Sequence, residues 1–169
     1  GSTDSSDRVD RAKDIALSKL TNKDQNLIDR IISNTNKPRH KVAAANLLND
    51  KDRALKIQTE IIENINDSTN CEEITPFIKN QDLIIRLLKA HGRHFSDFIL
   101  DAVQNLTSED HLLIAARDIE INRNYFDSFN SYFINIIEKI NNRSYLEDII
   151  QNALYDEAKL RAKHKLGLE

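Results

Sequence analysis

The sequence predicts an all-α fold without a β-sheet, in which eight to ten short or medium helices pack as a bundle or a short solenoid-like stack. Two observations carry this prediction. The 169-residue chain contains only three glycines and two prolines, the residues on which hairpins, bulges and tight turns depend. Its apolar residues recur with the spacing of a helix face, and no segment sustains the alternation typical of a strand.

Helix-start signals recur along the chain after a polar opening, residues 1–6, which we expect to be a disordered tag or linker. Each signal offers a side-chain oxygen that can accept a hydrogen bond from a free backbone N–H. The signals divide residues 7–166, which we expect to form one domain, into successive helices. They are Thr21-x-x-Asp24, Asn49-Asp50, Ser68-Thr69-Asn70, Thr75-Pro76, Thr107-Ser108 and Ser144-x-x-Glu147.

Four apolar stripes follow these signals, and each fits one face of a helix. Because an amphipathic helix cannot bury its stripe alone, the helices must pack against one another. The stripes are Ala54, Ile57, Ile61 and Ile65, widened by Leu55 and Ile62; Leu83, Ile84, Leu87 and Leu88; Phe126, Phe129, Phe133, Ile136, Ile137 and Ile140; and Leu146, Ile149, Ile150, Ala153 and Leu154.

A weak internal repeat relates residues 25–48 to residues 81–106. The blocks QNLIDRII and QDLIIRLL open the two ranges, and each is followed by a helix breaker, Pro38 or Gly92, and then by Arg-His. Such self-similarity is typical of helical repeat arrays. We therefore expect Gly92 to end a helix in a left-handed conformation, at the turn between two helices of one unit.

Composition excludes several classes of protein. A net charge of -3 argues against a dedicated nucleic-acid binder, and no apolar run is long enough for a membrane span. The single cysteine, Cys71, cannot form an internal disulfide and favours a reducing compartment, either the cytoplasm or the cytoplasm of a host cell. Frequent isoleucine and asparagine indicate an AT-rich genome, as in many host-associated bacteria. The chain lacks methionine, so we expect it to be a piece of a larger protein.

Catalytic signatures are missing from the sequence. It contains no P-loop, dinucleotide fingerprint, His-Glu-x-x-His motif or nucleophile elbow, most of which are built on glycine. Cys71 precedes two glutamates, which disfavour a reactive thiolate and favour a structural thiol. Neighbouring carboxylates such as Glu147 and Asp148 fit a solvated helix face. We accordingly predict no catalytic residues and no cofactor.

One cluster of potential metal ligands keeps an alternative open. His91, His94 and Asp97 are spaced three apart and would share one face of a continuous helix, where they could bind zinc. The interior glycine between the two histidines is expected to break that helix, and further ligands such as His40 or His111 would be needed. A metal-binding or catalytic helical domain is therefore the first alternative.

An aromatic segment supplies the candidate partner-binding residues. Five of the ten aromatic residues lie within residues 125–133. A helix that is apolar over so much of its circumference is either central to the core or presents its surplus to a partner. Tyrosine is a favoured interface anchor, so we predict that Tyr125, Phe129 and Tyr132 contact a partner; core packing is the other interpretation.

The basic stretch Lys159–Lys165 supports a second alternative, the binding of a nucleic acid or an anionic membrane. The same charges also complement the negative end of a helix.

The sequence as a whole favours a non-enzymatic interaction or scaffold module with a protein partner. It predicts no oligomeric state.

Overall fold

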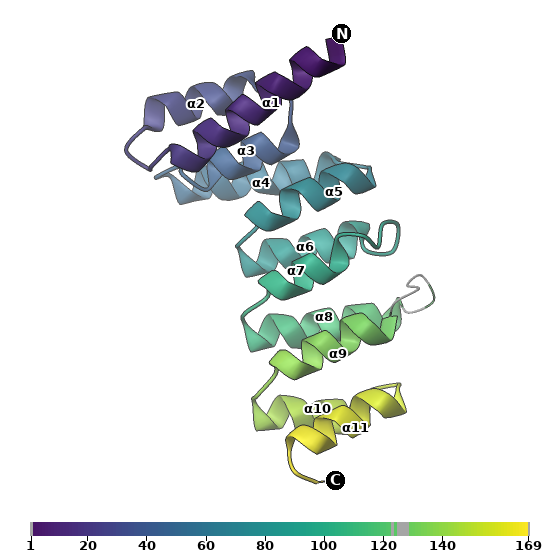
Figure 1. The fold of residues 1–169 in the computed structure, drawn as a ribbon. Coiled ribbons are helices and arrows are strands. Elements are labelled where there is room, and N and C mark those ends of the chain that lie inside the picture. Colours follow the sequence, from purple (N-terminus) through teal and green to yellow (C-terminus); the bar gives the residue numbers. More distant parts are fainter. Residues whose placement is uncertain (1, 123, 125–128, 169) are drawn as a thin grey trace. The chain divides into compact units, whose positions relative to one another are not determined.

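The computed structural model is all-helical, as the sequence predicts (Figure 1). It describes the backbone of residues 2–122, 124 and 129–168, and the side chains of residues 5–122, 124 and 130–168. Across these residues it contains eleven α-helices, one 3-10 helix and no strand, so the helices outnumber the eight to ten expected. None of the helices in this described part is both long and apolar enough to cross a membrane.

By their internal contacts the helices form two compact units. The N-terminal unit comprises residues 1–65 and the C-terminal unit comprises residues 66–169. Each unit has an apolar interior of its own, so each is described by itself.

The N-terminal unit consists of four helices in which α3 packs against the other three. Helix α1 begins at Ser2, so the opening that we expected to be disordered is helical from that residue onward. The helices are α1 (Ser2–Lys19), α2 (Gln25–Asn34), α3 (Pro38–Ala45) and α4 (Lys51–Asn64). Their shared core consists of Leu17, Ile28, Ile32, Ala44, Ala45, Leu48 and Ala54.

Charged contacts hold α1 against α3. Asp14 accepts hydrogen bonds from Arg39 Nε at 3.2 Å and Nη2 at 3.1 Å, and its Oδ1 lies 2.7 Å from Nε2 of the buried His40. Burial opposes ionisation of Asp14, but the bonds from Arg39 and His40 outweigh it and hold the pKa of the carboxyl below its usual value. Of the apolar side chains of α1 that the structure describes, Leu17 alone is buried, so these polar contacts position the helix.

The C-terminal unit is built from successive helix pairs (Figure 1). Helix α6 packs along α8, α7 along α9, and α9 along α11, so the second helices of consecutive pairs form one layer and the first helices lie beside them. The elements are α5 (Ser68–Ile74), the 3-10 helix η1 (Thr75–Phe77), α6 (Gln81–His91), α7 (Ile99–Asn105), α8 (Glu109–Ile121), α9 (Phe129–Lys139), α10 (Arg143–Asn152) and α11 (Asp156–Lys165).

Three of the predicted helix starts are confirmed, at α4, α5 and α8, and α5 begins at the predicted Ser68. Asp50 caps α4 by accepting the N–H of Arg53, and Ser108 immediately precedes α8. Two others are displaced. Helix α2 begins after Asp24 rather than Thr21, and α10 begins after Asn142, two residues before the predicted Ser144. The predicted start at Thr75-Pro76 yields only the short helix η1.

The predicted stripes are buried in part. All four residues of the α6 stripe are buried, as are Phe133, Ile136, Ile137 and Ile140. In α4 the buried face is rotated toward Gln58 and Ile62, while Leu55 is exposed. Gln58 is accommodated because its amide donates to Val42 O at 3.0 Å and Asn46 Oδ1 at 2.7 Å. Leu154 lies beyond the end of α10 and is exposed. Phe126 and the side chain of Phe129 lie outside the described residues.

Gly92 ends α6 as predicted, but its predicted left-handed conformation is wrong. Its backbone is right-handed, with φ -58° and ψ -39°. Among the described residues a positive φ occurs only at Gly167. Pro38 begins α3 whereas Gly92 ends α6, so the two breakers mark different points of their helices.

Candidate functional site

The first helices of three pairs begin with a long polar side chain that reaches the loop after the second helix of the same pair. Gln25 opens α2, Gln81 opens α6 and Glu109 opens α8. These side chains satisfy backbone groups that helix ends leave without partners. Their hydrogen bonds join Gln25 Nε2 to Leu47 O (2.9 Å) and Oε1 to Asn49 N (3.1 Å); Gln81 Nε2 to Asn105 O (3.2 Å) and Oε1 to Thr107 N (2.8 Å) and Ser108 N (3.1 Å); and Glu109 Oε1 to Asn141 N and Asn142 N (2.9 Å).

A second set of contacts starts from the C-terminal residues of the second helices. Helix α7 ends at Asn105, α9 at Lys139 and α11 at Lys165. Each of these side chains donates to backbone carbonyl groups near the end of the preceding helix pair. These bonds fill acceptors that a helix C-terminus exposes. The acceptors are Thr75 O for Asn105; Val103 O, Gln104 O and Leu106 O for Lys139; and Ile137 O, Glu138 O and Ile140 O for Lys165.

These contacts give consecutive pairs of the C-terminal unit a common register. Burial lowers the pKa of Lys139, whose amine points at carbonyl oxygens rather than at a carboxylate. These contacts are not evident in the sequence, because each joins residues about 30 positions apart. The polar residue that opens or closes each helix is the only local signal.

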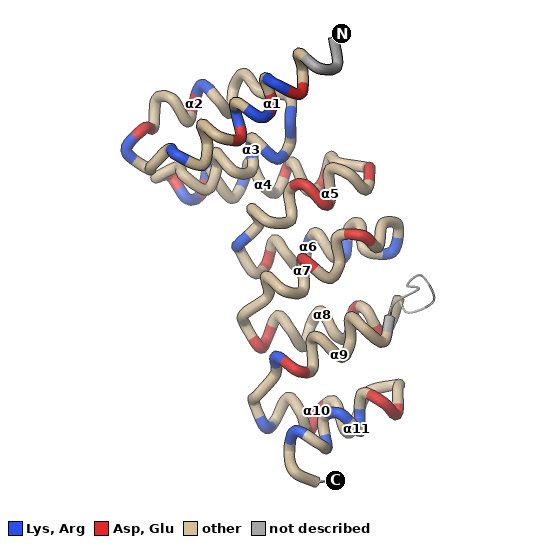
Figure 2. The backbone as a smooth tube through the Cα atoms, viewed as in Figure 1, with Lys and Arg blue, Asp and Glu red and all other residues tan. Residues whose placement is uncertain are grey.

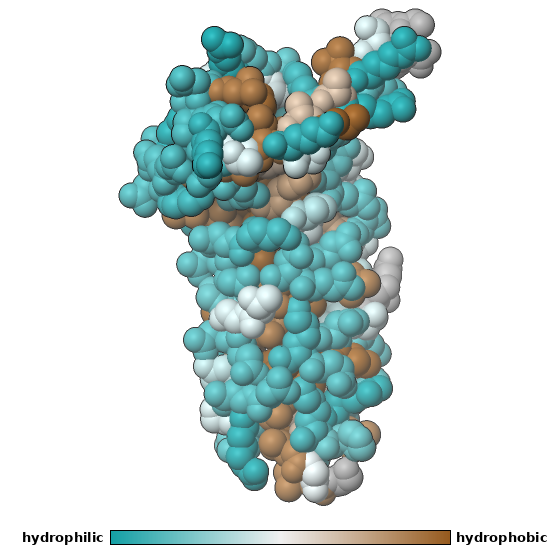
Figure 3. Space-filling view, turned by 60° about the vertical axis from the view of Figure 1, so that its left-hand side comes forward, coloured by the Kyte–Doolittle hydropathy of each residue, from teal (hydrophilic) through white to brown (hydrophobic). Residues whose placement is uncertain are grey.

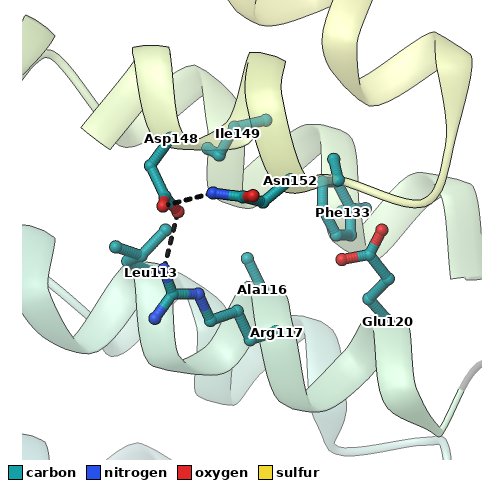
Figure 4. Close-up of a pocket in the computed structure, with 9 residues that line it drawn as sticks. Leu113, Ala116, Arg117, Glu120, Phe133, Asp148, Ile149 and Asn152 are labelled. Carbon is teal, nitrogen blue, oxygen red and sulfur yellow. Dashed lines mark hydrogen bonds and ion pairs between the residues drawn. The ribbon is translucent and has the colours of Figure 1, made fainter. Parts of the chain in front are cut away.

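A pocket opens between α8 and α10 (Figure 4). It encloses about 260 Å³, including space open to solvent. The apolar part of its lining consists of Leu113, Ala116, Phe133, Ile149 and Ala153, and the polar part consists of Arg117, Glu120, Asp148 and Asn152.

Polar contacts organise the lining. Arg117 donates to Asp148 Oδ2 at 2.6 Å, across the gap between α8 and α10. Asn152 donates to Asp148 Oδ1 at 2.8 Å from the same helix (Figure 4). Glu120 is only 7% exposed and accepts the backbone N–H of Leu154, in the turn after α10. Two carboxylates and one guanidinium therefore line a small hollow with apolar walls.

The predicted aromatic surface falls largely outside the described residues. Tyr125 and the side chain of Phe129 lie outside them. Tyr132 is buried, and its hydroxyl donates to Ser96 O at 3.3 Å. This residue therefore connects α9 to the turn between α6 and α7, as the packing interpretation expects. Phe133, the next residue of α9, is also buried, and it lines the pocket between α8 and α10.

The three candidate metal ligands of the first alternative, His91, His94 and Asp97, have separate surroundings. His91 is buried, with its ring stacked on Phe95 at 6.3 Å between centroids. His94 is exposed, and Asp97 accepts a hydrogen bond from Ser68 Oγ at 3.2 Å. Across the part of the chain that the structure describes, no three or more His, Cys, Asp or Glu side chains form a group able to hold a metal ion.

The two further histidines considered as ligands face single carboxylates. His40 lies beside Asp14, and Nε2 of His111 lies 2.6 Å from Asp82 Oδ1. Cys71 is buried, and burial together with the nearby carboxylates of Asp67 and Glu72 raises the pKa of its thiol to about 11. At neutral pH this thiol is protonated, which disfavours a nucleophilic role.

The basic C-terminal stretch forms most of α11. Lys165 is directed at carbonyl oxygens of the α9 end, and Arg161 lies 3.7 Å from Glu138. Ala158 and Ala162 are buried, so one side of α11 packs inward. Part of the positive charge that could contact phosphates is thus engaged within the unit.

The chain was compared with protein-family models, curated proteins and solved structures, and none of them matches it.

Proposed function

We propose that the chain is a non-enzymatic helical-repeat module that binds another protein. The supporting observation is the register of side-chain hydrogen bonds that joins consecutive helix pairs. Gln25 and Gln81 open the two blocks of the internal repeat, and each binds a carbonyl and an N–H around the end of the following helix. Stacked helix pairs of this kind form solenoids whose extended surfaces bind partners.

The surface of α8 offers the chemistry of a protein interface. Ile114 is 40% exposed and Ile121 is 73% exposed, and both lie on the side of α8 that also carries the exposed Arg117. Exposed apolar residues beside arginine are typical of protein interfaces. In Figure 3 apolar side chains are scattered among hydrophilic ones on the face shown.

The charge distribution favours a protein partner over a nucleic acid. Basic and acidic residues are interspersed along the C-terminal unit (Figure 2). Nucleic-acid binding depends on a continuous basic surface that releases counterions from phosphates.

Affinity capture with matched surface variants tests the proposal. The full chain, with a photo-crosslinking residue at Asn152, is incubated with extract of its source cells. We expect one protein to be captured in about equimolar amount by the wild type and Leu55→Glu, and roughly tenfold less by Ile114→Glu. Leu55 is a matched control because it is also 40% exposed but lies on α4. Capture of no protein above the level seen with the urea-unfolded chain would contradict the proposed function.

A further inference from the structure

We propose that the outward side of α1 binds an acidic amphipathic helix of another protein. This inference goes beyond the proposed function, because it assigns a second docking surface, on the N-terminal unit, with a ligand chemistry of its own. It is carried by the orientation of α1 and by the charges on its outward side, which are considered in turn below.

Helix α1 turns its acidic side toward α3. Asp10 Oδ2 lies 3.3 Å from Lys37 Nζ, and Asp14 is bonded to Arg39 and His40. Lys37 directly precedes α3, and the other two partners belong to that helix. The carboxylates on this side of α1 therefore already have their counter-charges.

The outward side of α1 carries an apolar stripe. Val9, Ala12 and Ala16 recur at spacings of three and four residues, which places them on one face of the helix, and Ile15 lies beside them. Val9 is 51% exposed and Ile15 is 56% exposed, and both alanines are exposed as well. An amphipathic helix usually turns its apolar stripe toward the core. The stripe of α1 therefore faces away from the unit to which the helix belongs.

Positive charge surrounds this stripe. Arg8 and Lys19 extend it at its two ends, Arg11 lies on its flank, and all three side chains are exposed. Among the described side chains, no carboxylate forms an ion pair with any of these three cations. Asp7 is the one exposed carboxylate of α1 within the same described set. The outward side thus lacks the counter-charges that an acidic partner supplies.

A protein helix fits this face better than a lipid surface or a second copy of the chain. Ala12 and Ala16 stand in the middle of the stripe, where small side chains let a second helix approach closely. A helix that lies in a membrane interface usually buries several bulky apolar residues, and this face offers Val9 and Ile15. A second copy would bring the like charges of two identical faces together. The partner helix is therefore expected to carry Asp or Glu beside an apolar stripe of its own.

A titration followed by NMR tests the chemistry of the ligand. The probe is a helical peptide of about 20 residues with leucines along one face and glutamates on both flanks, and its counterpart carries lysines in place of the glutamates. With the full chain, we expect the acidic peptide to give saturable shifts of the Ala12 and Ala16 amides. Its affinity should be about tenfold or more above that of the basic peptide and should fall as salt is added. Equal binding of the two peptides, or no saturable shift with the acidic one, would overturn the proposal.

Removal of the three cations locates the binding. The triple variant Arg8→Gln/Arg11→Gln/Lys19→Gln should weaken the acidic peptide about tenfold. It should keep the wild-type circular dichroism, because the three side chains are exposed. The matched control replaces by Gln three exposed cations of the same unit that lie outside α1, namely Lys23, Arg30 and Lys56. Unchanged binding in the α1 variant, or an equal loss in the control, would contradict the assignment.

A second pair of variants tests the apolar stripe. Ile15→Ser should weaken the acidic peptide about fivefold, because the partner helix covers an exposed isoleucine. Leu27→Ser is the control, since Leu27 is 45% exposed and lies on α2. Equal binding by the two variants would show that the peptide contacts the charges of α1 without packing on the stripe, and the docking surface as proposed would be wrong.

Two further measurements separate the other occupants. Vesicles of equimolar phosphatidylcholine and phosphatidylserine are expected not to sediment the chain, and analytical ultracentrifugation is expected to show no dimer that Ile15→Ser dissociates. Sedimentation with the vesicles that is lost in the triple variant would assign this face to a membrane. A dimer that Ile15→Ser dissociates would assign it to a second copy, and either result overturns the proposal. Capture through α8 is measured with separate variants, so the proposed function and this inference can fail independently.

Discussion

Gly92 shows why a sequence rule can identify the right residue for the wrong reason. The residue has helical dihedral angles that alanine also adopts readily. The constraint is instead a close approach of backbone atoms. The Gly92 N–H donates to Leu88 O at 2.8 Å, and a Cβ at residue 92 would lie 2.5 Å from that same oxygen. A side chain at this position therefore forces the end of α6 to shift.

The sign of the stability change on replacing Gly92 by alanine tests whether the contact with Leu88 O constrains this position. Where the backbone is compatible, glycine-to-alanine changes stabilise a protein by about 0.4–1 kcal/mol. Because of the contact with Leu88, we expect Gly92→Ala to lower the free energy of unfolding by about 1 kcal/mol, and Gly92→Val by more. Urea unfolding measures both. Ala90→Gly, at an exposed position of α6, is the control and should also destabilise, by about 1 kcal/mol. A more stable Gly92→Ala protein would contradict the close-contact explanation.

At the scale of the helices, the sequence predicts where chain breaks fall more reliably than which residue makes them. Asp50 and Ser108 were predictable because each directly precedes its helix, and the other capping residue nearby, Asn49 or Thr107, is the adjacent residue. Thr21 competes with Asp24, three residues away, and Ser144 with Asn142, two residues away, and the local pattern cannot rank such neighbours. The pocket was not predictable, because it depends on how closely two helices from different pairs pack.

The contact from Glu109 to the loop before α10 gives a pH-dependent prediction for one element. Hydrogen bonds from the backbone N–H groups of Asn141 and Asn142 hold the pKa of Glu109 below its usual value. The contact therefore stabilises the fold above the ordinary glutamate pKa of about 4.3, and the stabilisation is lost as pH falls through the lower folded-state pKa. We expect Glu109→Gln to be less stable than wild type at pH 7, with the difference shrinking toward pH 2.5.

Urea unfolding of both proteins across this pH range measures the effect. The control is Glu147→Gln, which removes only an exposed ion pair with Arg143 and should change stability little at any pH. A difference between wild type and Glu109→Gln that does not vary with pH would show that the carboxylate charge is not what joins α8 to the loop.

At the scale of the whole molecule, low glycine and proline content with helical periodicity was enough to predict an all-α chain. It does not reveal the two compact units, because these are defined by contacts between helices rather than by a local sequence pattern. The division becomes visible in long-range contacts. In the C-terminal unit, Asn105, Lys139 and Lys165 each bind the end of the preceding pair, and the carbonyl oxygens that accept these bonds lie within the same unit.

This division predicts that residues 66–169 fold without the N-terminal unit. A cut between residues 65 and 66 leaves α5 with its N-cap, because Asp67 accepts the Asn70 N–H at 2.7 Å. We expect this fragment to remain helical by circular dichroism and to unfold cooperatively in urea, with a slope of about 1 kcal/mol/M or more.

A shorter fragment, residues 81–169, removes the Thr75 carbonyl to which Asn105 donates, together with the rest of η1 that packs on α7. We expect it to be less stable than residues 66–169 by about 1 kcal/mol or more, because a part-buried hydrogen bond and its apolar surroundings are lost together. Equal stability of the two fragments would show that α5 and η1 do not belong to the cooperative unit, and a non-cooperative transition of residues 66–169 would contradict the division itself.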